Sequence, residues 1–118
     1  MKLNKIRVSS EATHKLGMLK SRTGLTPNIL CRMGFCLSLN EPGIPNKEQY
    51  IEDGMEFNRY TLTGQFDTLF VSLLKERCLQ DKIYADGDLP EYFLAHVNRG
   101  IELLYVRLKS LRDLTNIL

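Results

Sequence analysis

The sequence predicts a mainly α-helical, compact single domain that begins with one short β-strand. Three observations carry this prediction. Polar and apolar residues alternate near the N-terminus, two adjacent segments carry helix-capping residues, and apolar residues recur at helical spacing through most of the second half. The chain has 118 residues, which is enough to bury a core without disulfides or metal ions.

The strand is expected over residues 3–9, LNKIRVS. Its polar face would carry Lys5, Arg7 and Ser9, because successive side chains of a strand point to opposite sides. A lone strand leaves its backbone hydrogen-bonding groups without partners, and the sequence offers no clear second strand. We therefore expect this strand to pair with the same segment of a second copy.

Two helices are expected to follow the strand directly. The first begins after Ser9 and ends at Gly24, a residue type that favours the left-handed conformation at helix ends. The second has Thr26 as its N-cap, continues with a proline, and ends near Asn40. Gly34 lies within it and would allow another segment to approach closely.

The rest of the chain is expected to form a loop and further helices. Residues 41–64 form the acidic loop, with a short extended piece around Tyr60–Thr63. Residues 65–118 form the helical remainder. It contains one helix near 65–82 and a long final helix that Pro90 opens and that continues toward the C-terminus.

Positive charge is concentrated in the first third of the chain. Residues 1–40 contain seven Lys or Arg and one acid, and residues 41–56 contain five acids and one base, although the whole chain carries only +2. Such a basic segment indicates contact with an anionic partner, while a solvated surface is the alternative. The candidates for phosphate contacts are Lys2, Lys5, Arg7, Lys15, Lys20, Arg22 and Arg32.

The first forty residues resemble the ribbon-helix-helix DNA-binding proteins. The alternating KIRVS and the GLTPN that leads into the second helix carry this resemblance. It implies that the outward side chains of the strand enter the major groove. It also implies a phosphate anchor at Thr26 and Asn28, where the free N–H groups of a helix start attract anions.

The whole chain resembles the DNA sulfur modification family DndE. Three blocks carry this resemblance in order: KIRVSSEA, RTGLTPNILCRMGFCLSL and EFNRYTLTG. It implies a small helical, tetrameric, DNA-binding subunit of a bacterial system that replaces a non-bridging phosphate oxygen of DNA with sulfur. Its implied partners are nicked duplex DNA and the sulfur-transfer and ATPase subunits of that system. A nick has no fixed sequence, so we expect contacts to the DNA backbone.

The sequence offers little support for an enzyme. Cys31 and Cys36 would lie about 140° apart around a helix, so they cannot share one metal ion. Glu52, Asp53 and Glu56 resemble a metal cluster, but a solvated acidic loop is the simpler interpretation. We expect no catalytic residue, no metal and no cofactor. A protein scaffold with incidental DNA affinity is the main alternative function.

The remaining expectations concern location and assembly. No segment approaches the roughly 20 apolar residues of a membrane span, and the N-terminus lacks the apolar region of a secretory signal. Three cysteines suit a reducing compartment, so we expect the cytoplasm. The apolar surface of the helices exceeds one stripe, which predicts a homo-oligomer, a tetramer built as paired dimers.

Overall fold

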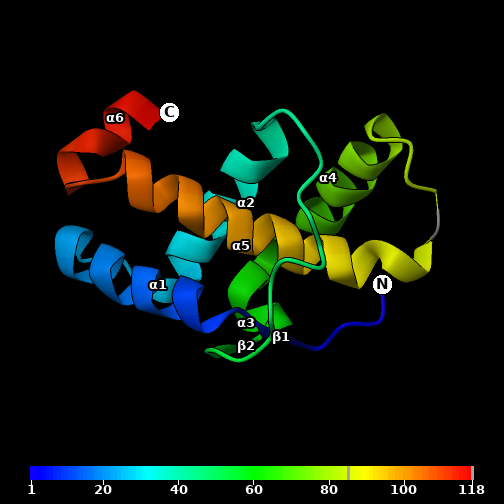
Figure 1. The fold of residues 1–118 in the computed structure, drawn as a ribbon, viewed down its shortest axis with the longest axis horizontal. Coiled ribbons are helices and arrows are strands. Elements are labelled where there is room, and N and C mark those ends of the chain that lie inside the picture. The colour runs from blue at the N-terminus through cyan, green and yellow to red at the C-terminus, as the bar shows by residue number, and fades with distance from the viewer. Residues whose placement is uncertain (85, 118) are drawn as a thin grey trace.

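Helices dominate the computed structural model, which describes residues 1–84 and 86–117 (Figure 1). This confirms the mainly α-helical fold that begins with a short strand. The elements in chain order are β1 (Lys5–Arg7), α1 (Ser10–Thr23), α2 (Pro27–Asn40), β2 (Glu56–Asn58), α3 (Arg59–Thr63), α4 (Asp67–Gln80), α5 (Leu89–Arg107) and α6 (Leu114–Ile117). Three 3-10 turns precede α4, α5 and α6, at Gly64–Phe66, Asp86–Asp88 and Leu111–Asp113.

The N-terminal strand finds its partner within the same chain. β1 pairs antiparallel with β2, with Ile6 opposite Phe57 and Arg7 opposite Glu56. The expected pairing with a second copy is therefore wrong. β2 has only three residues and turns directly into a helix, so it carries none of the extended alternation that identifies a strand.

The segment expected to be extended around Tyr60–Thr63 is the helix α3. Its N-cap is Asn58, whose side-chain oxygen accepts hydrogen bonds from the backbone N–H groups of Tyr60 and Thr61. The predicted loop is correspondingly shorter, because residues 56–63 belong to β2 and α3.

The capping residues of the first two helices act as predicted. The Ser9 hydroxyl accepts a hydrogen bond from Ala12 N at 3.0 Å, and Gly24 ends α1 with a φ of 76°. The Thr26 hydroxyl accepts from Ile29 N at the start of α2. The strand-helix-helix order of residues 1–40 is thus confirmed.

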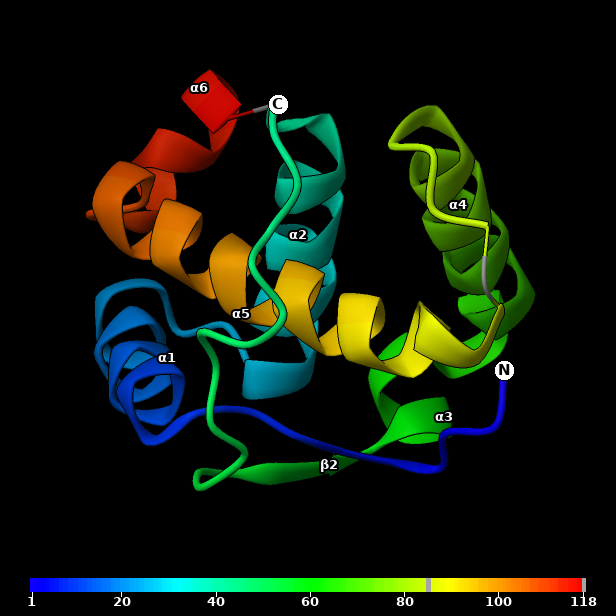
Figure 2. The same ribbon diagram turned by 45° about the vertical axis from the view of Figure 1, so that its right-hand side comes forward.

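The core forms where α5 crosses α2 (Figure 2). A Cβ atom added to Gly34 would lie 2.8 Å from the carbonyl carbon of Gly100, so the two backbones touch. This confirms the close approach predicted at Gly34. Beside the crossing, Phe35 packs against Phe70 and Phe93, with ring centroids 5.6 Å and 4.9 Å away.

The final helix is shorter than predicted. α5 ends at Arg107, and Leu108 adopts an extended conformation that buries its side chain completely. A new helical segment begins after Ser110, because Ser110 and Asp113 form a capping box. The Ser-x-x-Asp spacing in the sequence signals this second start.

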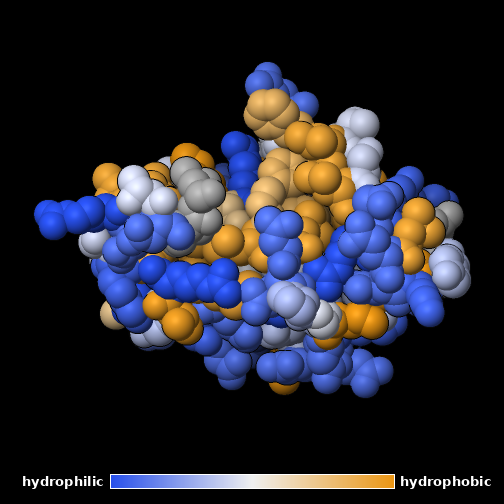
Figure 3. Space-filling view, turned by 90° about the horizontal axis from the view of Figure 1, so that it is seen from above, coloured by the Kyte–Doolittle hydropathy of each residue, from blue (hydrophilic) through white to orange (hydrophobic). Residues whose placement is uncertain are grey.

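Helix α4 divides its apolar residues between the core and the surface. Phe70 and Leu74 are buried. Phe66, Leu69 and Leu73 follow one another at helical spacing on the outside, with 47%, 54% and 38% of their surface exposed. Figure 3 shows hydrophobic side chains gathered in the middle of the face seen from above, with hydrophilic ones around them. Among the described helices, none combines the length and the apolar character needed to cross a membrane.

Candidate nucleic-acid interface

The strand residues of the predicted interface are paired with an acid from the same sheet. Glu56 on β2 lies 3.0 Å from the Arg7 guanidinium and 4.0 Å from the Lys5 ammonium. Arg7 also donates a hydrogen bond to Gly54 O at 3.0 Å. One carboxylate therefore compensates part of the positive charge that the two cations bring to the ribbon.

The residues predicted near the start of α2 serve the fold. The Arg32 guanidinium donates hydrogen bonds to the carbonyl oxygens of Leu62 and Thr61, which lie in the last turn of α3. The Thr26 hydroxyl already caps its own helix, and Asn28 is half-buried. Lys2 is exposed near the N-terminus, and the N-terminus and α1 lie on opposite sides of the molecule in Figure 2.

Two of the predicted residues meet around an aromatic ring that the sequence analysis did not identify. Arg22 lies over the Tyr105 ring, 4.5 Å from its centroid, and the Lys15 ammonium is 5.7 Å from the same centroid. The Lys109 ammonium completes the group at 5.5 Å. We call Lys15, Arg22, Tyr105 and Lys109 the Tyr105 cluster.

Two neighbouring helices build this cluster. α1 lies beside α5, and positions 15 and 22 are two turns apart on one face of α1 (Figure 2). Arg22 donates a hydrogen bond to Tyr105 O at 3.1 Å, and Lys109 Nζ donates to the same oxygen at 3.3 Å. This carbonyl lies in the last turn of α5, where the helix dipole attracts cations.

The positive charge of the cluster is not compensated by nearby carboxylates. In the described part of the chain, no ion pair involves Lys15, Arg22 or Lys109. Asp113, four residues after Lys109, accepts hydrogen bonds from the backbone N–H groups of Lys109 and Ser110. Lys20 is a further exposed cation on α1, although five residues along the helix place it about 140° around the axis from Lys15. Such a surface attracts polyanions.

The acids considered as a metal cluster have other contacts. Asp53 accepts hydrogen bonds from the backbone N–H and the hydroxyl of Ser10, at 2.7 and 3.2 Å, and so holds the loop against the start of α1. Glu56 pairs with Arg7. Within the described residues, no group of three or more His, Cys, Asp or Glu is placed to hold a metal ion.

The cysteines do not meet either. Burial raises the pKa of the Cys31 thiol to about 12, and it also raises the pKa of the buried Cys78 thiol. Cys36 is exposed on α2, and partial burial raises its pKa as well. All three therefore favour the thiol form, which is the poorer nucleophile and metal ligand.

His96 lies in the interior beside the C-terminal end of α2. Burial, with smaller contributions from Arg99 and Arg77, lowers its pKa to about 3, so the imidazole is neutral. Its Nδ1 lies 2.8 Å from the Ser38 hydroxyl, which accepts a hydrogen bond from Arg99. The Ser38 hydroxyl thus links His96 and Arg99 by hydrogen bonds, and this network holds α5 against α2.

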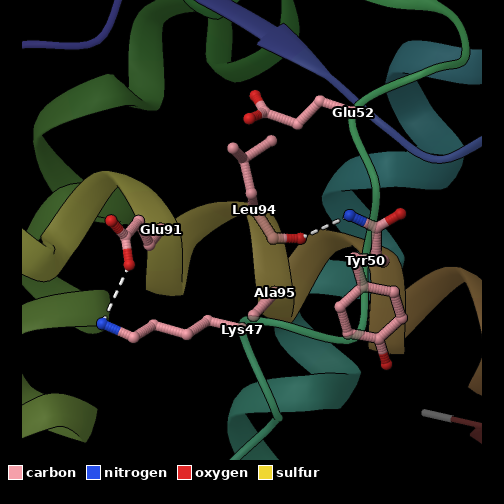
Figure 4. A pocket seen from close by; sticks show the side chains of 7 residues that line it. Lys47, Tyr50, Glu52, Glu91, Leu94 and Ala95 are labelled. Atoms are coloured by element: carbon pink, nitrogen blue, oxygen red, sulfur yellow. Dashed lines mark hydrogen bonds and ion pairs between the residues drawn. The ribbon is translucent and has the colours of Figure 1, made fainter.

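A pocket of about 180 Å³ lies between the acidic loop and α5 (Figure 4). Two of its charged groups compensate one another, because Lys47 Nζ is 2.8 Å from Glu91 Oε2, and Glu52 is a second carboxylate in the lining. The Tyr50 hydroxyl lies beside Glu102, and burial raises its pKa to about 12. The lining residues are Lys47, Tyr50, Glu52, Glu91, Leu94, Ala95 and Asn98.

Comparison with known proteins identifies the family. The profile of the family described as DNA sulphur modification protein DndE matches residues 5–112. The chain belongs to the DndE family. This confirms the resemblance carried by the three sequence blocks and connects the chain to a family of DNA sulphur modification.

Solved DndE structures share this fold. DndE from Escherichia coli B7A, described as involved in DNA phosphorothioation modification, is 28% identical with a TM-score of 0.72, and the match covers 88% of this chain and 98% of that chain. A DndE mutant described as involved in DNA phosphorothioation is 26% identical with a TM-score of 0.70, covering 88% and 99%. Among curated proteins, no sequence matches this chain.

The sequence analysis missed two members of the cluster. Tyr105 lies 83 residues after Arg22, and Lys109 follows Tyr105 by four residues, just beyond the end of α5. A tyrosine followed four residues later by a lysine is a common spacing, so the sequence alone does not single this pair out. The packing of α5 against α1 is what brings Tyr105 next to Lys15 and Arg22.

Proposed function

We propose that this DndE-family chain is a non-catalytic DNA-binding subunit of a DNA phosphorothioation machinery. It binds duplex DNA, nicked duplex in particular, through contacts to the phosphate backbone. The observation that supports this proposal is the Tyr105 cluster, where three cations gather around one ring and none pairs with a carboxylate of the described residues. The proposal places the protein in the bacterial cytoplasm, with its DNA and the other subunits of the system.

Backbone binding fits the arrangement of the charges better than base reading does. Lys5 and Arg7 would have to leave Glu56 before they could enter a major groove. The Tyr105 cluster and Lys20 need no such change, because they are exposed or half-exposed along α1 and the end of α5. Lys and Arg side chains arranged in this way follow phosphates without reading sequence.

We also propose that the chain forms a homotetramer built as paired dimers. The stripe formed by Phe66, directly before α4, and by Leu69 and Leu73 on α4 supports a contact with a second copy, because large apolar residues at helical spacing lose their contact with water in such a pairing. Four copies would multiply the basic surface and gain avidity from weak phosphate contacts.

Gel shift with nicked and intact duplexes over a salt series tests DNA binding. We expect the logarithm of the binding constant to fall with the logarithm of salt concentration, with a slope near 0.9 for each phosphate contact. Lys15→Met together with Lys20→Met should make the slope shallower, while Lys75→Met on α4 is the matched control for loss of one exposed lysine. Absence of binding at low salt would refute the proposal.

Two further measurements separate the alternatives. If the double variant keeps both partner capture and full modification, the scaffold hypothesis is favoured. Incubation of plasmid with the protein and Mg²⁺ or Mn²⁺ tests the absence of nuclease activity. Light scattering tests the assembly: a mass near 13.6 kDa at micromolar concentration would contradict it, and Leu69→Asp should lower the mass of a tetramer.

A further inference from the structure

We propose that the Tyr105 cluster is a site for a phosphate monoester, the group found at the end of a DNA strand. This inference rests on the proposed DNA-binding function and makes its substrate more specific. It concerns which phosphate the cluster takes, whereas the proposal above concerns phosphates in general.

The charge of the cluster fits a dianion better than a single backbone phosphate. A phosphodiester inside a strand carries one negative charge. A phosphate monoester carries about 1.5 to 2 negative charges at pH 7 and has three terminal oxygens. Lys15, Arg22 and Lys109 bring three positive charges to one ring, and none is paired with a carboxylate among the described residues.

The hydrogen-bond donors of the cluster converge but are not used up. Arg22 and Lys109 reach the same carbonyl oxygen of Tyr105, so their cationic groups are neighbours. A guanidinium has five N–H donors and an ammonium has three, and each of these two groups uses one donor on that oxygen. Lys15 has no side-chain hydrogen bond within the described chain and approaches only the ring. The remaining donors can bind several oxygens of one anion.

Capping of α5 explains only part of this arrangement. The last carbonyl groups of a helix attract a cation, and one of Arg22 or Lys109 would suffice for Tyr105 O. A third cation, Lys15, adds repulsion and gains only a distant ring contact of 5.7 Å. A bound dianion offsets that repulsion.

Terminal phosphates distinguish a nick from intact duplex. Intact duplex presents only phosphodiesters along its length, whereas a nick can present a 5′-phosphate. A site that prefers the monoester therefore favours a 5′-phosphorylated nick over the same nick with a 5′-hydroxyl. A small soluble phosphate ester carries the same phosphate monoester group. The experiment must therefore distinguish the end of a DNA strand from a soluble ester.

Fluorescence anisotropy with three matched duplexes tests this inference: a 5′-phosphate nick, a 5′-hydroxyl nick and no nick. We expect wild-type protein to bind the 5′-phosphate nick about tenfold more tightly than the 5′-hydroxyl nick, the size of one added charge-assisted hydrogen bond. Lys15→Met should abolish this ratio, and it leaves the contacts of Arg22 and Lys109 with α5 in place. Lys20→Met removes the same charge from the same helix and should lower all three affinities while keeping the ratio.

A soluble source is tested with thymidine 5′-monophosphate, read through the NMR signals of the Tyr105 ring. If the nick terminus has no effect but the nucleotide shifts these signals in wild type and not in Lys15→Met, the monoester site is supported with a small ligand. If neither probe responds, the inference is overturned. Equal affinity for the two nicked duplexes, with no response to the nucleotide, would overturn only this inference, whereas the proposed function fails if duplex binding is lost altogether.

Discussion

Replacement of Gly100 by alanine should separate the two helices at the centre of the core. A Cβ atom at this position would lie 1.9 Å from the carbonyl oxygen of Gly34, whereas ordinary contacts begin near 3.4 Å. α2 and α5 would have to move apart by about 1.5 Å. Neighbouring side chains cannot follow without loss of packing, because protein interiors are close-packed.

The expected loss follows from two opposing effects. Overpacking of a core costs about 3 kcal/mol when backbone must move, and alanine recovers up to about 1 kcal/mol of helix propensity. We therefore expect Gly100→Ala to lower the free energy of unfolding by at least about 2 kcal/mol. Gly17→Ala is the matched control, because nothing lies within 4 Å of its added Cβ on α1. That variant should gain roughly 0.5–1 kcal/mol.

Urea unfolding followed by circular dichroism measures both variants. Protein concentration should be equal in all samples, because an oligomer's stability depends on it. An unfolding free energy of Gly100→Ala within about 0.5 kcal/mol of wild type would refute the reasoning. A loss in Gly17→Ala as large as that in Gly100→Ala would show that any helical alanine is harmful and would refute it equally.

Three other predictions follow from single contacts. Because the pKa of His96 is lowered to about 3, the unfolded state binds a proton that the folded state does not once pH falls below about 6.5. Urea titrations should show an unfolding free energy that falls by up to about 1.4 kcal/mol per pH unit from there toward pH 3, and His96→Gln should flatten the profile between about pH 6.5 and 5. Glu56→Gln should release Lys5 and Arg7, and gel shifts should show a steeper salt dependence, by up to about 0.9 per freed contact; an unchanged slope speaks against masking. In the wild-type structure the buried Arg59 guanidinium lies 2.8 Å from the Asp67 carboxylate. Asp67→Asn removes this counter-charge, so thermal melts should show a free energy of unfolding lower by about 3 kcal/mol. A melting temperature equal to wild type would contradict this.

Local signals made the first two helices predictable. Ser9, Gly24 and Thr26 act within one turn of their own helix, so their effect can be recognised without any knowledge of the rest of the chain. Gly34 also predicted that another segment approaches α2 closely, although its partner Gly100 could not be identified from the sequence. The partner of β1 was missed because three residues of β2 are too few to form a pattern.

The candidate interface was predictable only where one helix carries it. Lys15 and Arg22 share a face of α1, so their neighbourhood follows from helical periodicity. Lys109 joins them through tertiary packing. The masking of Arg7 by Glu56 likewise depends on the register of the sheet, which no local pattern encodes.

The antiparallel pair β1–β2 also sets an order of events during synthesis. Arg7 and Glu56 are 49 residues apart, and ribosomes add about 5–20 residues per second, so the strand waits about 2–10 s for its partner. The helices α1 and α2 form in microseconds once they emerge. During that interval the nascent chain carries an unpaired basic strand beside the polyanionic ribosome. Synthesis of Glu56 thus supplies both the partner strand and the carboxylate that pairs with Lys5 and Arg7.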